Sequence, residues 1–209
     1  METPPTEAQR SARFASYIEA RRFDPPRPLL KKAAALVERR EHALDAGAGA
    51  LNATKYLLSA GFGHVTALDA SPHAQKIAAE LPPERVRFVL ARFEDFEFPE
   101  NSYDLVNAEF TLPFINREHF TSVFAKLLHS VRDGGIFTGQ LFGVNDSWNV
   151  ENRGMSFHTR AEVEELFRDF ELLQLEEEDH PGTTKLGEPK HWHIFHIVAS
   201  LGRRRANAE

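Results

Sequence analysis

Leu44-Asp45-Ala46-Gly47-Ala48-Gly49-Ala50 is the stretch that decides the fold. It ends a short apolar run from His42 that is typical of a buried strand, and residues 52–60 after it have the spacing of a helix that ends before Gly61. Glycines in a strand-to-helix turn permit positive φ angles and let a ligand approach the backbone closely. The stretch therefore predicts a strand–turn–helix unit with a ligand site over the carboxyl end of the strand.

Strand and helix patterns alternate along most of the chain, which predicts a parallel sheet with crossover helices. The expected strands are 42–46, 64–68, 86–90, 103–108 and 136–142, and the expected helices are 7–22, 29–39, 52–60, 71–81, 117–131 and 159–168. Two last extended runs, 170–177 and 192–200, should pair antiparallel because their connection is short. We expect an α/β fold with a Rossmann-like, doubly wound, mostly parallel seven-stranded sheet and an antiparallel C-terminal hairpin.

The composition of the chain excludes or disfavours several classes of site and partner. The length of 209 residues favours one domain, and 42% hydrophobic with 27% charged residues is ordinary for a globular protein. The absence of cysteine excludes disulfides, thiolate nucleophiles and cysteine-ligated metal sites. A net charge of −6 disfavours binding to nucleic-acid phosphates. No apolar stretch is long enough to cross a membrane, and the polar, acidic start is unlike a secretory signal, so we expect a cytoplasmic protein.

Asp45 discriminates between ligands of such a turn. A dinucleotide places its pyrophosphate over the helix N-terminus, and a carboxylate just before the turn would repel that group. S-adenosylmethionine carries no phosphate, and its methionine end bears an ammonium and a sulfonium that a carboxylate attracts. Asp69 ends the second strand at close to the spacing, roughly twenty residues, of a carboxylate that binds ribose hydroxyls. The two acids favour an adenosyl ligand over NAD.

At this point the chain resembles the class I S-adenosylmethionine-dependent methyltransferases over about residues 40 to 142. The resemblance rests on four landmarks in order: Asp45-Ala46-Gly47-Ala48-Gly49, Thr66-Ala67-Leu68-Asp69-Ala70-Ser71, Phe98-Pro99-Glu100-Asn101-Ser102-Tyr103-Asp104-Leu105-Val106 and Asp133-Gly134-Gly135. The helix-and-hairpin ending also looks like small bacterial methyltransferases of the tellurite-resistance or thiol-methylating type. The resemblance implies methyl transfer from S-adenosyl-L-methionine to a small-molecule acceptor.

The resemblance also implies a set of cofactor-binding residues. Gly47 and Gly49, with Asp45, should line the methionine end of the cofactor, while Asp69 should bind the ribose and Ala70 should lie beside the adenine. The remaining implied residues are Arg92 and Phe93 after the third strand and Ala108 and Glu109 after the fourth. Glu109 is assigned to the methionine end or to the acceptor. Two positions depart from the family pattern: Arg92 stands where many relatives have an acid, and Leu51 where a third glycine is common.

The resemblance divides the chain by role. Residues 1–200 are expected to form a single methyltransferase domain, followed by a polar tail over 201–209. Within the domain, 1–40 would be an N-terminal helical lid or cap, 41–142 the cofactor-binding half, and 143–200 an acceptor-side loop, helix and hairpin.

Catalytic candidates are few, because methyl transfer needs a base only when the acceptor carries a proton. His180 and His191 are the candidate bases at the rim of the acceptor pocket, with structural histidines as the alternative. No metal is expected, because His191 and His193 share one face of a strand while His196 points to the other. Competing readings are an NAD-dependent oxidoreductase and a non-catalytic adenosyl-binding module; a homodimer is compatible with the sequence.

Overall fold

One sheet organises the molecule. The computed structural model describes residues 7–150, 154–184 and 187–202. It places eight strands in one sheet, in the order β3-β2-β1-β4-β5-β8-β7, with β6 pairing β5 off this path. The strands are β1 His42–Ala46, β2 His64–Asp69, β3 Val86–Leu90, β4 Tyr103–Ala108, β5 Val131–Gly143, β6 Phe157–His158, β7 Glu171–Thr183 and β8 Pro189–Ser200.

The strand order reverses its direction of growth at β1. β1 pairs in parallel with both β2 and β4, and β5 continues the parallel part beyond β4. β8 is antiparallel to β5 and to β7, which completes the expected C-terminal hairpin. The carboxyl ends of β1 and β4 therefore meet at a topological switch point, where open α/β sheets bind their ligands. The predicted fold class is confirmed, with the two-residue β6 as an addition to the seven expected strands.

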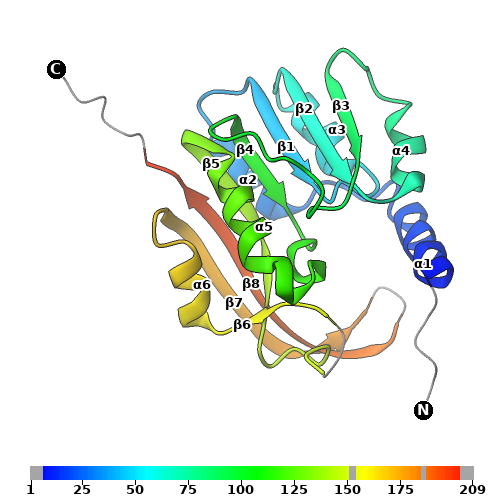
Figure 1. Ribbon diagram of the computed structural model, residues 1–209, viewed down its shortest axis with the longest axis vertical. Helices are drawn as coiled ribbons and strands as arrows, with labels where there is room; N and C mark the ends of the chain where they lie inside the picture. Colours follow the sequence, from blue (N-terminus) through cyan, green and yellow to red (C-terminus); the bar gives the residue numbers. More distant parts are fainter. Residues whose placement is uncertain (1–6, 151–153, 185–186, 203–209) are drawn as a thin grey trace.

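Helices cover both faces of the sheet (Figure 1). The helical elements are α1 Glu7–Ala20, α2 Pro28–Leu36, α3 Asn52–Ser59, α4 Pro72–Ala78, the 3₁₀ turn η1 Leu112–Phe114, α5 Arg117–His129 and α6 Arg160–Leu166. Leu30 of α2 and Leu57 of α3 are fully buried in one core cluster, together with Leu105 of β4. Phe124 of α5 and Phe137 of β5 are buried in a second cluster that lies on the opposite face.

Several element boundaries differ from the sequence expectation. β5 begins at Val131, which pairs with Tyr103, and absorbs Asp133-Gly134-Gly135 through a register shift instead of starting after them. The helix expected to reach residue 81 ends at Ala78, and the chain continues in a tighter turn in which Glu80 N–H donates to the Ile77 carbonyl and Leu81 N–H to the Ala78 carbonyl. β7 extends to Thr183 and β8 begins at Pro189, so much of the expected polar connection is paired strand.

Candidate functional site

The glycine turn between β1 and α3 is folded onto the end of β2. The backbone N–H groups of Gly47 and Ala48 both donate to the Leu68 carbonyl, at 2.8 and 3.0 Å. Gly47 has φ of 79°, and a Cβ there would lie 2.1 Å from Thr111 Oγ1, so this position requires glycine. At Gly49 an added Cβ would meet only the Gly47 carbonyl oxygen, at 3.9 Å. The turn therefore leaves no room for a side chain at Gly47, whereas the space next to Gly49 is open.

Leu51 is one of the two positions that depart from the family pattern. Its backbone is left-handed, with φ of 58°, at the N-cap of α3, and its side chain is fully buried. A left-handed conformation favours glycine, which accounts for a third glycine being common in relatives. Here burial of the leucine side chain offsets that conformational cost.

Asp69 ties the glycine turn to the start of α4. One carboxylate oxygen accepts from Gly49 N–H at 2.8 Å and the other accepts from Ser71 N–H, also at 2.8 Å. Burial raises the pKa of Asp69, and these two backbone hydrogen bonds oppose the rise. Each carboxylate oxygen has a further lone pair for a ribose hydroxyl. Ala70, next in the chain, is exposed beside it.

Asp45 is placed beneath the turn rather than open to solvent. It is 1% exposed, and its carboxylate accepts from the Thr54 hydroxyl at 2.6 Å and from Asn107 Nδ2 at 2.9 Å. Burial raises the pKa of Asp45, while both hydrogen bonds lower it. Because the Asn107 NH₂ group is held by Asp45, its Oδ1 faces the other way, where it has no partner.

Unpartnered polar atoms gather on one face of the sheet, near the carboxyl end of β4 and within the paired strands β5 and β8. In the described part of the chain, five buried side-chain polar atoms lack a hydrogen-bond partner. Four of them are Asn107 Oδ1, Glu109 Oε1, Thr138 Oγ1 and His196 Nε2. Asn107 pairs with Thr138 across the sheet, and His196 pairs with Gln140 of β5. Since buried polar groups are normally hydrogen-bonded, this stripe is fitted to a polar ligand.

Glu109 is the strongly perturbed acid of this stripe. Burial raises its pKa to about 7, and the nearby Asp45 adds to the rise. The Arg27 guanidinium, the Leu30 backbone N–H and the Gln140 side chain act in the opposite direction. Arg27 itself lies over the Phe110 ring, 4.2 Å from its centroid.

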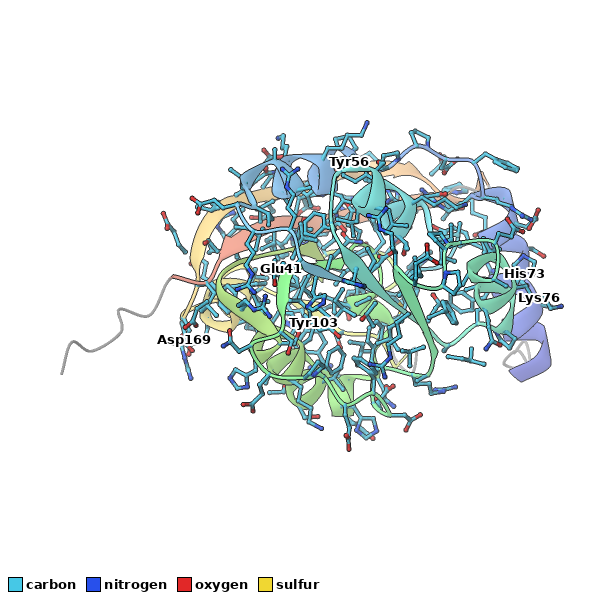
Figure 2. The ribbon with its side chains drawn as sticks, turned by 90° about the horizontal axis from the view of Figure 1, so that it is seen from above. Glu41, Tyr56, His73, Lys76, Tyr103 and Asp169 are labelled. Carbon is cyan, nitrogen blue, oxygen red and sulfur yellow. The ribbon has the colours of Figure 1, made fainter. Side chains whose placement is uncertain are left out.

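The N-terminal helix lies against the glycine turn. Ile18 of α1 is buried in the same cluster as Ala48, Ala50 and Leu51. Asn52 of α3 donates to the carbonyl of Arg21, just after α1, at 2.7 Å. On the α4 side, His73 Nε2 lies 3.0 Å from Glu19, and Figure 2 shows His73 on α4 beside α1. This placement suits the expected lid or cap.

Aromatic side chains of η1 and of the loop after β5 form an aromatic edge next to the candidate site. Phe114 is 46% exposed and makes ring contacts with Phe14 of α1 and with Trp148. Behind them, Lys190 forms an ion pair with Asp146 whose side chains are both fully buried. The Lys190 ammonium lies 4.0 Å from the Trp148 ring centroid, so the pair fixes this part of the loop.

The other predicted residues lie on the β7–β8 hairpin and in the segment after β3. His180 contacts Glu178 and the Pro181 carbonyl, which raises its pKa, and His191 pairs with Asp179 at 2.5 Å. These contacts belong to the β7–β8 hairpin. Arg92 is exposed after β3, and Phe93 stacks on Phe98.

No group of three histidine, acidic or cysteine side chains among the described residues is arranged to hold a metal ion. Sequence reasoning missed Thr138, Gln140 and His196. Thr138 and Gln140 could have been recognised from the sequence, because they are two polar residues on one face of the otherwise apolar run 136–142.

Comparison with known proteins finds a matching domain family and solved structures of similar fold. Residues 43–135 match the family described as methyltransferase domain. The 1,6-didemethyltoxoflavin-N1-methyltransferase of Burkholderia thailandensis, solved with S-adenosylhomocysteine, is 20% identical, with 97% of this chain and 93% of that one covered and a TM-score of 0.60. TehB of Haemophilus influenzae is 18% identical, with 91% and 67% covered and a TM-score of 0.71.

A curated relative matches over a shorter stretch. The rat mitochondrial arginine-hydroxylase NDUFAF5 is 30% identical over 101 residues, which cover 48% of this chain and 29% of that protein. The match thus spans under a third of that relative's length. Residues 43–135 thus match a methyltransferase domain, and the chain as a whole has the fold of these methyltransferase structures.

Proposed function

We propose that this protein transfers a methyl group from S-adenosyl-L-methionine to a small-molecule acceptor. The observation that carries the proposal is the unpartnered acceptor atom Asn107 Oδ1, beside the glycine turn at the switch point. A buried acceptor atom without a donor fits the ammonium at the methionine end of this cofactor. The open space over Gly49 fits close approach of its nucleoside part.

The proposed cofactor contacts keep the residues expected from the sequence. Gly47, Gly49 and Ala108 offer backbone to the methionine end, with Asp45 acting there by holding Asn107. Asp69 takes the ribose hydroxyls. Ala70, Arg92 and Phe93 lie on the adenine side, at the ends of β2 and β3.

The chain's own residues position the reactants and keep water out. The bound cofactor supplies a methyl group on a positively charged sulfur, and in-line displacement needs alignment more than a nucleophilic side chain. α1, seated on the turn through Ile18, closes one side of the site. His180 and His191 stay predictions as bases at the rim.

A small, ring-bearing acceptor is supported by the aromatic edge next to the site. Phe114 offers an exposed ring face, and Trp148 stands behind it in a loop fixed by the buried Lys190–Asp146 pair. Aromatic side chains favour flat apolar surfaces. The B. thailandensis relative, by its name, methylates a small molecule, which agrees with this choice.

Location and assembly are kept as predictions. No helix in the described ranges is long and apolar enough to cross a membrane. The cytoplasmic location, the lack of a nucleic-acid partner and the homodimer rest on sequence arguments alone.

Calorimetric titration with S-adenosylmethionine, S-adenosylhomocysteine and NAD tests the cofactor. We expect both adenosyl ligands to bind and NAD not to bind, because Asp45 and Glu109 place acids where a pyrophosphate would lie. Asp69→Ala should lose most of the affinity, and Asp169→Ala, an exposed acid after α6, serves as the control. Binding of NAD alone would reject the proposal. Binding of S-adenosylhomocysteine with no methylation across an acceptor panel would favour the non-catalytic module.

A further inference from the structure

A hydrogen-bonded row crosses the sheet from β4 to β8 at the side of the proposed methyl-transfer site. The Phe110 backbone N–H donates to Gln140 Oε1 at 3.0 Å, so both donor hydrogens of Gln140 are on Nε2. Nε2 lies 3.4 Å from His196 Nδ1, and the Gln140 side chain also hydrogen-bonds Glu109. Gln140 thus fixes the carboxyl of Glu109 on one side and the ring of His196 on the other.

His196 is oriented by this contact. Because Nδ1 accepts from Gln140, the ring proton resides on Nε2. That atom lies 3.4 Å from Glu178 Oε1, at ion-pair distance but without a hydrogen bond. Gln140 therefore donates to Glu109 on one side and to His196 on the other.

Glu109 keeps one acceptor atom free within this row. The Leu30 N–H and the Gln140 side chain donate to its carboxylate, while Oε1 is buried and has no partner. The charged groups that face it are Arg27, from the segment before α2, and Asp45 of β1. A carboxylate held by fixed donors, with one buried oxygen open, is built to receive a hydrogen from a ligand.

We propose that Glu109 Oε1 accepts the proton lost by the methyl acceptor, which is therefore an N–H or O–H nucleophile, with Gln140 and His196 as positioning residues. This inference rests on the proposed function. The acceptor's nitrogen or oxygen forms a bond to the methyl carbon, and the carbon–sulfur electron pair returns to sulfur. The acceptor's proton passes to Glu109 Oε1 and leaves to solvent after turnover.

The ionisation of Glu109 suits this role. Burial raises its pKa to about 7, so the carboxylate form is abundant at neutral pH and the acid form is readily reached. General-base catalysis is most efficient when the pKa of the base is near the working pH. A thiolate or a tertiary amine would have no need of this group.

The test follows S-adenosylhomocysteine formation from pH 5.5 to 9, using the full chain with S-adenosylmethionine. The probes are aniline and catechol, which carry N–H and O–H groups and do not titrate near pH 7, and dimethyl sulfide and pyridine, whose nucleophilic atoms carry no proton at neutral pH. We expect wild-type turnover of aniline or catechol, with a rate that falls below pH about 7. Glu109→Gln should lower kcat about 100-fold or more and remove that acidic limb. Glu84→Gln, an exposed acid before β3, is the matched control.

A second pair of measurements separates the roles. Gln140→Leu should shift the midpoint of the acidic limb and lower kcat with little change in KM, which a purely structural residue would not do. Glu109→Gln should bind S-adenosylhomocysteine within about threefold of wild type, less than the factor of ten that 1.4 kcal/mol represents. A parallel loss of affinity and kcat would make Glu109 a cofactor ligand and overturn the inference.

Two further outcomes would overturn either the inference or the proposed function. An unchanged pH profile in Glu109→Gln, or turnover restricted to dimethyl sulfide or pyridine, overturns the inference while leaving methyl transfer intact. Failure of the wild-type protein to bind S-adenosylhomocysteine instead rejects the proposed function itself. The two failures are therefore distinguishable.

Discussion

Asp45 acts on the site through its neighbour. Its carboxylate is nearly fully buried and accepts hydrogen bonds from Thr54 and Asn107. In the proposed site, Asp45 therefore acts on the ligand by fixing the orientation of the Asn107 side-chain amide. This arrangement keeps a negative charge below the turn, and it turns Asn107 Oδ1 towards the ligand side. Electrostatics and hydrogen-bond geometry therefore favour the same cationic ligand end.

Removing Asp45 should affect stability and binding together. Asp45→Ala leaves two buried donors unpaired and should cost about 2–4 kcal/mol of unfolding free energy, while Thr54→Val should cost only about 1–2 kcal/mol. Only Asp45→Ala should weaken S-adenosylhomocysteine binding strongly, because only it frees the Asn107 amide. Urea unfolding and calorimetry measure the two effects. Equal affinity losses in both variants would contradict the role given to Asn107.

Glu109 should make stability depend on pH. Its folded-state pKa of about 7 exceeds the ordinary 4.5, so the folded state binds more protons between these values and loses stability as pH rises through them. At 1.36 kcal/mol per pH unit, the cost above pH 7 reaches up to about 3 kcal/mol. Glu109→Gln should therefore stabilise the protein at pH 8 and be nearly neutral at pH 4.5. A urea series at both pH values checks this, and equal effects at the two would contradict it.

At the scale of elements, α1 is held to the turn by one apolar anchor and by polar contacts at its rim. Ile18 is buried, whereas the ion pairs of Glu19 with His73 of α4 and of Arg22 with Glu80 after α4 are partly exposed and contribute at most about 1 kcal/mol each. The attachment of α1 to the turn therefore depends mainly on Ile18.

Ile18→Ala should loosen the attachment of α1. Loss of a buried isoleucine side chain costs about 2–4 kcal/mol, here concentrated on the contact between α1 and the turn. We expect faster amide exchange in α1 and weaker S-adenosylhomocysteine binding, with β1 and β4 protected as before. Phe23→Ala removes a side chain that is 91% exposed in the same segment and should change neither. Unaltered exchange in Ile18→Ala would show that α1 is held in another way.

The elements also show what the sequence could and could not reveal. Strands with clear periodicity were predicted within a few residues, whereas β6 has only two residues and no period to detect. The glycine turn and Asp69 were readable because their chemistry is local. The row of Glu109, Gln140 and His196 was not, since these residues become neighbours only once β4, β5 and β8 are known to be adjacent.

For the whole molecule, the sheet order links the two halves of the proposed reaction. The β1–β4 switch point places the glycine turn beside the acids. The antiparallel β8 brings His196 to the same face as Gln140 of β5. The polar stripe across β4, β5 and β8 is thus a consequence of topology. A sheet with a different strand order would not assemble it.

A crystal structure of the complex with S-adenosylhomocysteine tests the central claim most directly. We expect the ligand over the carboxyl ends of β1 and β4, with its amino group within hydrogen-bond distance of Asn107 Oδ1 and its ribose hydroxyls on Asp69. Density for the ligand away from this switch point, or an amino group that makes no contact with Asn107, would contradict the account.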